Sequence, residues 1–358
     1  MAEREQRVAF IDFLKGVCIF LVVWGHSIQY LSSSGYDFWN NRIFIFIYSF
    51  HMPLFMMLSG LFFIRSMSLP FGVVLKKRFF QLILPSIVWG GGVTIFIYLL
   101  AKFLNHTLID KEFIYQMILQ SPFSYWFLFA LFLCTVLAYI SYSVFKNKIF
   151  VSAFVTIFII LILPDFCFEF VATKYMLPYF WLGIILSAKK RFFNDYGKSI
   201  FIFSVVLFIV LLFFWKEEYY IYKTGMEFYH FDLKSGTFQS MDWKHRLWVV
   251  SFRYLIGTAG CFSMYYVVKY VYNNFSLKYF KKKMNSIGIA TLGIYLISIK
   301  LNLLLEKLGE YRPSSEFIYN FVYTPVISIF ILWLCLKMIA VLKKNRISKL
   351  LFLGIKTN

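Results

Sequence analysis

A lysine and a histidine in the first apolar segment have the types and the spacing to act on one ligand. Lys15 and His26 are eleven residues apart. That is close to three turns of an α-helix, so both side chains project from one face, about 16 Å apart along the axis. An ammonium group binds anions, and an imidazole accepts protons near neutral pH. The pair predicts a general base placed three turns from an anion site.

Each member of this pair also has a purely structural interpretation. The Lys15 amine can extend to lipid headgroups while its stem stays apolar, and His26 can simply hydrogen bond inside a helical bundle. Asp12 adds a third ionisable side chain to the same segment. Such groups are costly inside a membrane, which makes each of them a candidate functional residue.

The second apolar segment reads Phe50-His51-Met52-Pro53-Leu54-Phe55 and continues to Ser59-Gly60. A short loop joins it to the first segment, so His51 and His26 are expected at similar depth. Pro53 is expected to kink the helix, because it lacks a backbone donor. For Ser59-Gly60 the sequence favours close helix packing over a nucleophilic serine, because no base lies beside it locally.

Further cations precede or interrupt other apolar segments. The run Lys76-Lys77-Arg78 is either a clamp for phosphates through charge-assisted hydrogen bonds or the ordinary basic flank of a membrane span. Arg253 lies inside a span, where we expect it to be paired, to contact a polar ligand or to extend outwards to the headgroups.

The elements that carry these residues must lie in lipid. The chain has 358 residues, of which 60% are hydrophobic, and its mean hydropathy is +0.70. A membrane span needs roughly 20 apolar residues. We predict one all-α domain, residues 1–358, with about ten transmembrane helices near 9–31, 43–64, 79–101, 123–145, 149–164, 175–188, 199–215, 247–268, 285–304 and 318–342, the fifth and sixth being short.

The charge of the chain alternates from loop to loop. With the N-terminus in the cytoplasm, the inside segments hold 22 of the 37 Lys and Arg residues and only three acidic ones, whereas the outside segments hold 11 basic and 13 acidic residues. This asymmetry follows the positive-inside rule and predicts that both termini are cytoplasmic. It also argues against nucleic-acid binding, despite the net charge of +20.

The remaining signals are weak or negative. Five cysteines lie in or beside apolar segments without a Cys-x-x-Cys pair, so neither a metal site nor a disulfide framework is expected. The first apolar segment contains Asp12 and Lys15, so we expect it to stay as a span rather than act as a cleavable signal. The loop 216–246 carries aromatics that suit either a sugar surface or the headgroup region, namely Tyr219, Tyr220, Tyr222, Phe228, Tyr229 and Trp243.

These segments, in this order, resemble acyltransferase family 3, the integral membrane O-acyltransferases, and in particular its fucose 4-O-acetylase-like subgroup. The strongest matches are Asp12-Phe-Leu-Lys15-Gly16 through Trp24-Gly25-His26, and Phe50-His51-Met52-Pro53-Leu54-Phe55 with Leu58-Ser59-Gly60. Weaker support comes from the run ending at Pro85 and from segments around Trp126, Pro178 and Tyr295.

The resemblance implies transfer of an acetyl or other short acyl group to a hydroxyl of a glycan or lipid-linked sugar outside the cytoplasm. The donor would be cytoplasmic acetyl-CoA, with no permanently bound cofactor, and the protein would lie in the plasma membrane, as in a bacterial inner membrane. His26 would be the catalytic base, and Lys15, Lys76, Lys77 and Arg78 would hold the donor. Candidate substrate-binding residues are His51, Arg253, Asp12, Ser59, Trp126 and Tyr295.

The sequence departs from the family pattern in three places. The usual Arg-x10-His appears as Lys15-x10-His26, which keeps the charge but loses bidentate geometry. The usual Arg-x-x-Arg appears as Arg78-Phe79-Phe80-Gln81, and Ser298 stands where relatives often have histidine. No motif specifies the sugar, its hydroxyl, the acyl length or the oligomeric state.

Two other functions fit the same polar residues. In a glycan or lipid transporter or flippase they would line a substrate or proton path, although no repeated half-structure is visible. In a non-catalytic scaffold they would only fix helix packing, and replacing His26 would leave function intact.

Overall fold

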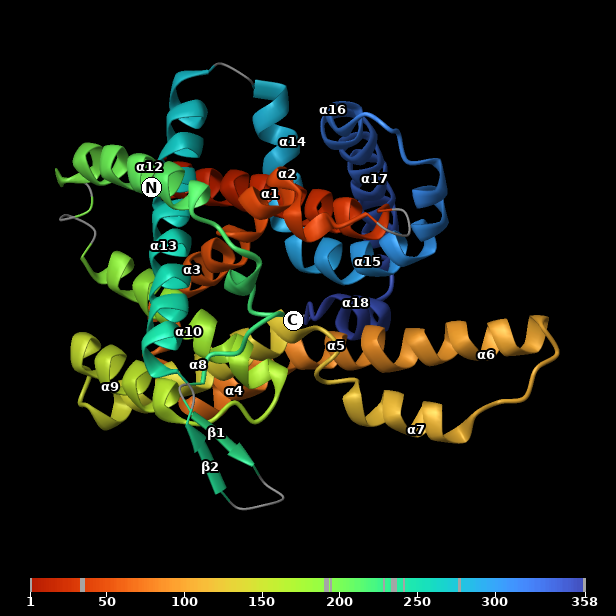
Figure 1. The fold of residues 1–358 in the computed structure, drawn as a ribbon, viewed down its shortest axis with the longest axis horizontal. Coiled ribbons are helices and arrows are strands. Elements are labelled where there is room, and N and C mark those ends of the chain that lie inside the picture. The colour runs from red at the N-terminus through yellow and green to blue at the C-terminus, as the bar shows by residue number, and fades with distance from the viewer. Residues whose placement is uncertain are drawn as a thin grey trace.

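The structure is a computed structural model that describes residues 2–32, 36–189, 193, 195–227, 229–232, 237–240, 242–275 and 278–356. Within these residues the chain is helical apart from one antiparallel hairpin, β1 (Tyr229–Asp232) and β2 (Thr237–Ser240), in which Tyr229 pairs with Ser240 (Figure 1). Phe228 lies outside the described residues, as do Lys190 and Arg191, and the side chain of Tyr229 is not described. The predicted all-α class is confirmed.

Seven helices in the described part of the chain are long and apolar enough to cross a membrane. The bounds of the seven are Ala9–Tyr30, Arg42–Ser66, Phe71–Leu104, Trp126–Val144, Phe168–Ala188, Trp243–Asn274 and Glu316–Leu342. Three of them, Arg42–Ser66, Phe71–Leu104 and Glu316–Leu342, comprise several helical segments in a row.

The named helices within and between these spans follow the predicted order. They are α1 (Ala2–Tyr30), α2 (Arg42–Tyr48), α3 (His51–Phe63), α4 (Phe71–Arg78), α5 (Leu84–Ile87), α6 (Thr94–Leu104), α7 (Lys111–Gln120), α8 (Trp126–Val144), α9 (Ile149–Ile162), α10 (Phe168–Ala188), α12 (Gly197–Phe213), α13 (Trp243–Asn274), α14 (Lys278–Ile289), α15 (Thr291–Leu304), α16 (Glu316–Ile318), α17 (Thr324–Leu342) and α18 (Arg346–Leu353).

Each of the ten predicted segments coincides with helix. The fifth and seventh, α9 and α12, are shorter apolar helices, and the ninth is a pair, α14 and α15, that meets at 80°. The prediction of a short sixth segment is wrong, because α10 has 21 residues and begins at Phe168. Ten crossings therefore remain a prediction, while the multi-pass character of the protein is clear.

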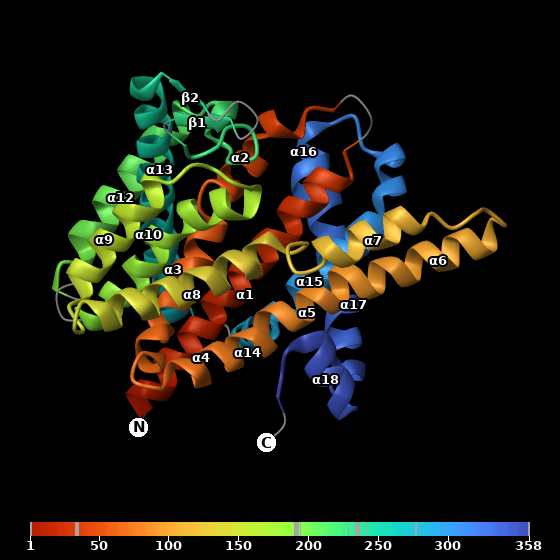
Figure 2. The same cartoon turned by 90° about the horizontal axis from the view of Figure 1, so that it is seen from below.

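The two ends of the described chain lie at one end of the molecule (Figure 2). The hairpin, α2 and α16 lie at the opposite end. Helix α1 is central, because it contacts α2, α3, α13, α14, α15 and α17. This arrangement places the stripe that carries Lys15 and His26 in the interior of the bundle.

Two glycines bring the backbones of α1 and α14 into contact. A Cβ added to Gly288 would lie 1.7 Å from the carbonyl oxygen of Asp12, and one added to Gly16 would lie 2.2 Å from that of Met284. Small residues allow this close approach between membrane helices. The contact fixes the inner half of α1, and with it Lys15, against the α14–α15 bend.

Replacing Gly288 by alanine is expected to destabilise the protein by about 1–3 kcal/mol, the usual cost of overpacking, because the new methyl group meets backbone rather than a movable side chain. Thermal unfolding in detergent measures the change. Gly72→Ala is the matched control: a Cβ there meets nothing within 4 Å, so alanine should be neutral or stabilising. Equal unfolding temperatures for the two variants would contradict this packing account.

Helices α3 and α10 pack through glycines as well. A Cβ on Gly60 of α3 would lie 2.0 Å from the carbonyl oxygen of Phe180, and one on Gly183 of α10 would lie 2.0 Å from that of Met57. The packing interpretation is therefore confirmed for Gly60.

The second span is interrupted at Ser49 and Phe50, between α2 and α3 and three to four residues before Pro53. A proline breaks a helix at this point because its ring clashes with the carbonyl of residue i−4, so the predicted interruption is present.

Candidate functional site

A cavity of ≈ 190 Å³ lies against the predicted stripe of α1. Lys15, Ile19 and Val22 line it at successive helical turns. We call it the basic cavity, after its two cations; its walls are Lys15, Ile19, Val22, Met52, Phe55, Leu58, Ser59, Arg78, Gln81, Leu82, Phe127, Leu128, Leu131, Thr291, Leu292 and Tyr295. The cavity is therefore mainly apolar, with positive charge from Lys15 and Arg78.

Lys15 and Arg78 converge on this cavity from different helices. Lys15 is 3.5 Å from a carboxylate oxygen of Asp12 and lies over the ring of Phe62. The Arg78 guanidinium lies over Phe63 and donates a 3.1 Å hydrogen bond to the side-chain oxygen of Gln81. Both cations are partly buried, and neither has its full set of donors used by these contacts, so the cavity can receive an anionic group.

The other predicted donor-binding residues lie elsewhere. Lys76 and Lys77 are exposed on α4 and are not among the lining residues of the basic cavity, so their predicted contact with a ligand there finds no support in the geometry. Asp12 pairs with Lys15 rather than facing the cavity. Gln81, which replaces the second arginine of the family pattern, does line the cavity and orients Arg78.

His26 lies one helical turn beyond Val22, at the end of the stripe. It is half-buried, and its Nδ1 is 3.4 Å from the hydroxyl of Tyr48. The ring of Tyr48 also meets that of His51 edge-on, with centroids 4.7 Å apart. Tyr48 therefore lies between the two imidazoles, which the structure brings together as their similar predicted depth suggested.

His51 has a defined tautomer. Its Nδ1 is 2.7 Å from the carbonyl oxygen of Ile47. Because a carbonyl only accepts, Nδ1 carries the proton, and in the neutral ring Nε2 has a free lone pair. The side chain is buried and lines a second cavity.

This second cavity, of ≈ 30 Å³, is mostly aromatic, and we call it the aromatic cavity. Its walls are Tyr48, His51, Met52, Pro53, Trp126, Tyr175, Met176, Trp215, Tyr219, Tyr220, Ile221, Tyr222, Arg253 and Ile256. Met52 belongs to both cavities. Val22, one helical turn before His26, lines the basic cavity, and Tyr48, which contacts His26, lines the aromatic one; His26 itself is among the lining residues of neither.

The predicted residues Ser59, Trp126 and Tyr295 divide between the cavities. Ser59 and Tyr295 line the basic cavity, and Trp126 lines the aromatic one. The Ser59 hydroxyl donates to the carbonyl oxygen of Phe55 in its own helix, at 2.9 Å. That Ser59, Trp126 and Tyr295 bind a substrate stays a prediction.

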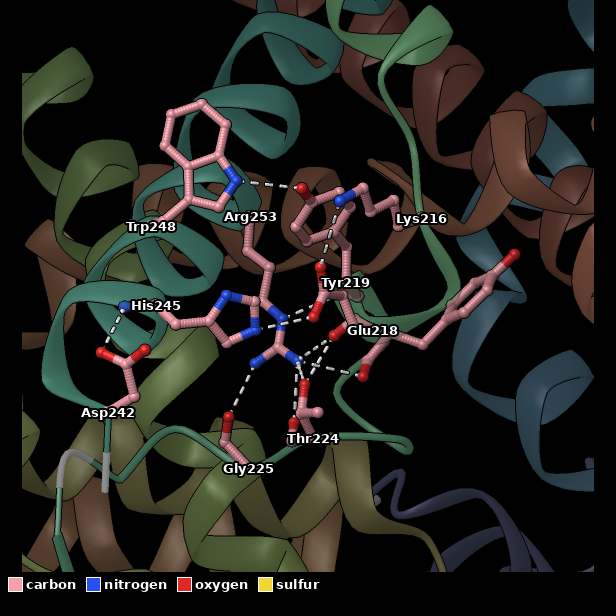
Figure 3. A network of polar contacts seen from close by, with 10 residues as sticks. Lys216, Glu218, Tyr219, Thr224, Gly225, Asp242, His245, Trp248 and Arg253 are labelled. Carbon is pink, nitrogen blue, oxygen red and sulfur yellow. Dashed lines mark hydrogen bonds and ion pairs between the residues drawn. The ribbon is translucent and has the colours of Figure 1, made fainter. Parts of the chain in front are cut away.

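Arg253 is held by the loop that covers the aromatic cavity, residues 216–227, which we call the capping loop (Figure 3). Its guanidinium donates to backbone carbonyls of this loop at 2.8–3.1 Å, namely those of Glu218, Tyr219, Tyr220, Thr224 and Gly225. It also contacts the Thr224 hydroxyl and the Met226 sulfur. All its donors are used, so the predicted direct contact with a substrate gives way to a positioning role.

A buried ion pair anchors the same loop from the other side. Asp165 is 2.7 Å from Lys174 of α10 and accepts hydrogen bonds from the backbone N–H groups of Met226 and Glu227. Lys174 is fully buried and also donates to the carbonyl oxygen of Leu163. Sequence reasoning missed this pair, since Lys174 and Asp165 read as ordinary charges of a short outside segment.

The outer-loop aromatics are partly built into this cover. Tyr219 stacks on Phe252, and Tyr220 donates to the carbonyl oxygen of Trp39. Burial raises the pKa of the Tyr220 and Tyr222 hydroxyls, so both remain protonated donors at neutral pH. Three of the predicted aromatics, Tyr219, Tyr220 and Tyr222, thus line the aromatic cavity; Tyr219 and Tyr220 are buried, whereas Tyr222 is also 42% exposed.

Comparison with known proteins identifies relatives. A family described as "Acyltransferase domain" matches residues 8–340. The nodulation protein NolL of Mesorhizobium japonicum is 30% identical over 235 residues, and the one of Sinorhizobium fredii is 37% identical over 97 residues. These alignments cover 61% and 25% of this chain, and 59% and 25% of the relatives. No solved structure matches the chain significantly.

Proposed function

Because the chain belongs to the acyltransferase family that matches residues 8–340, we propose that it moves an acetyl or other short acyl group from cytoplasmic acyl-CoA to a hydroxyl of a glycan or lipid-linked sugar outside. It is a multi-pass membrane acyltransferase, and the plasma membrane is the proposed location. The observation that carries the proposal is the placement of α1: its Lys15 shares a mainly apolar cavity with Arg78 of α4, and His26 follows one helical turn after Val22, the last α1 residue that lines this cavity.

The basic cavity suits the donor. Lys15 and Arg78 supply charge-assisted hydrogen bonds for phosphates, and the apolar walls beyond them suit an extended thioester arm. The distance from Lys15 to His26, about three helical turns or 16 Å, is comparable to that arm. The prevalence of positive charge on the loops at the end where both termini lie supports donor entry from the cytoplasm.

The side chains of the aromatic cavity are of the types that bind sugars, but its volume of ≈ 30 Å³ has room for only about two waters, so a sugar would bind there only after the capping loop moves. Tyrosine and tryptophan present an apolar face and a polar tip, a combination that packs against a ring while donating hydrogen bonds. The capping loop and Trp126 supply these side chains, and the hairpin that follows the loop lies at the end of the molecule opposite the termini (Figure 2).

The chemistry needs one base and one electrophile. The acceptor hydroxyl attacks the thioester carbonyl carbon while its proton passes to the free ring nitrogen of His26, the carbon–sulfur bond breaks, and the proton then passes to the departing thiolate. In the alternative, the unprotonated ring nitrogen of His26 attacks the thioester carbonyl carbon and the CoA thiolate leaves; the acceptor hydroxyl then takes the acyl group from the imidazole, and its proton passes to the thiolate. Both routes require a ring nitrogen without a proton.

Neutralising either cation of the basic cavity is expected to raise KM for acetyl-CoA about tenfold, which corresponds to about 1.4 kcal/mol of lost binding. Lys15→Gln and Arg78→Gln test this in steady-state assays. Lys76→Gln is the matched control, since Lys76 is exposed on the same helix as Arg78. If Lys76→Gln raised KM as much as Arg78→Gln, donor binding in this cavity would be excluded.

The proposed function is tested with purified protein in proteoliposomes, given labelled acetyl-CoA on one side and candidate glycans on the other. Label on the glycan supports acyl transfer. Glycan that crosses the bilayer unmodified would instead support a flippase.

A further inference from the structure

A tyrosine and a glutamine beside His26 complete a directed hydrogen-bond chain. The hydroxyl of Tyr48 is 3.4 Å from His26 Nδ1 and 3.4 Å from the side-chain oxygen of Gln29. Gln29 lies three residues after His26 on α1, so both side chains leave the helix on one face. Tyr48 is the last residue of α2.

The chemistry of these groups sets the direction of the chain. A carboxamide oxygen accepts and does not donate, and a tyrosine has a single hydroxyl proton. Tyr48 therefore donates to Gln29, and its oxygen is left to accept the proton carried by His26 Nδ1. The proton of the neutral ring then sits on Nδ1, and Nε2 has the free lone pair.

Packing holds the Tyr48 hydroxyl in place. The ring of Tyr48 stacks on Phe44, with centroids 3.8 Å apart and planes at 24°, and its edge meets His51. The residue before it, Ile47, accepts the Nδ1 proton of His51. The end of α2 thus gives both imidazoles the same tautomer.

Resting on the proposed role of His26 as base, we infer that Tyr48 and Gln29 are positioning residues that fix His26 with its proton on Nδ1 and its Nε2 free to accept the acceptor's proton. Orienting partners of a functional histidine control its tautomer and ring orientation. Neither residue touches a reacting atom, and Tyr48 also forms part of the aromatic cavity where the acceptor is proposed to bind.

The test compares Tyr48→Phe, Gln29→Leu and Gln29→Glu in the labelled-acetyl assay. The first two variants should lose about 10–100-fold in kcat, the range for lost orienting partners, with KM for acetyl-CoA unchanged. Gln29→Glu keeps an accepting oxygen and should recover most of the kcat that Gln29→Leu loses. Tyr30→Phe is the matched control: the Tyr30 ring lies near His26, with centroids 6.1 Å apart, and its loss should change kcat by less than about threefold.

A spectroscopic readout separates orientation from simple packing. In solid-state NMR of histidine-labelled protein in bilayers, with the His26 signal assigned from His26→Gln, the wild type should show the Nδ1-protonated tautomer and Gln29→Leu a mixture. Wild-type kcat and an unchanged tautomer in both Tyr48→Phe and Gln29→Leu would overturn the inference. If His26→Gln itself retained full activity, the proposed base would fail instead.

Discussion

Replacing His26 by alanine should lower kcat by about 10²–10⁴-fold, the usual contribution of a positioned general base. The loss should be in kcat rather than in KM for acetyl-CoA, because Lys15 lies about three turns away along α1 and Arg78 lies beside it in the basic cavity. Alanine favours helix, so α1 should remain intact. The measurement is the initial rate of labelled acetyl transfer in proteoliposomes, together with the thermal unfolding of each variant.

A control histidine tests whether the effect is specific. His106 is exposed after α6 and has a positive φ of 50°, which asparagine tolerates, so His106→Asn should keep wild-type rates. Activity of His26→Ala within a few-fold of wild type, in folded protein, would remove His26 from the chemistry. It would favour the scaffold interpretation, in which the polar residues of the spans serve packing alone.

Replacing Arg253 by methionine should destabilise the protein by about 3–5 kcal/mol, because a buried polar group left without its partner costs about 1–3 kcal/mol. Methionine fills a similar volume but leaves two buried and three partly buried carbonyls of the capping loop without their donor. The loop should detach, so transfer to the acceptor should fall as well. Thermal unfolding measures the loss of stability, and limited proteolysis at Lys216 and Lys223 measures the detachment of the loop.

Lys244→Met supplies the comparison for this variant. Lys244 is exposed near the start of the same helix, α13, and its amine lies over the ring of Trp243, so its loss should leave both stability and proteolysis unchanged. An Arg253→Met protein that unfolds at the wild-type temperature and resists proteolysis equally would show that the capping loop is held by other contacts.

Hydropathy and helical phase predicted much of this molecule because both are local properties. The length of apolar runs located helices at all ten predicted segments, and the eleven-residue spacing placed Lys15 and the residues leading to His26 along one cavity. The bend of 80° between α14 and α15 was not predicted, because an apolar run carries no signal of its direction.

The parts of the site that escaped prediction depend on contacts between distant segments. Arg253 was recognised as a buried cation, but its partners are backbone carbonyls about 30 residues earlier, which no side-chain pattern marks. Tyr48 was not predicted as a site residue, because the motif around His51, three residues later, carried the stronger signal. A hydroxyl one turn before a functional histidine, at the end of a short helix, is the signal that would have found it.

The most direct test of the account is photoaffinity labelling with an acetyl-CoA analogue that carries a photoreactive group on its acyl chain. Mass spectrometry then maps the labelled residues. If donor and base meet as proposed, label falls on α1 between residues 19 and 30 and on the facing part of α2 and α3 between residues 48 and 55, and excess acetyl-CoA suppresses it. Label on lipid-facing helices such as α9, or label that acetyl-CoA does not suppress, would contradict a donor lying along the stripe from Lys15 to His26.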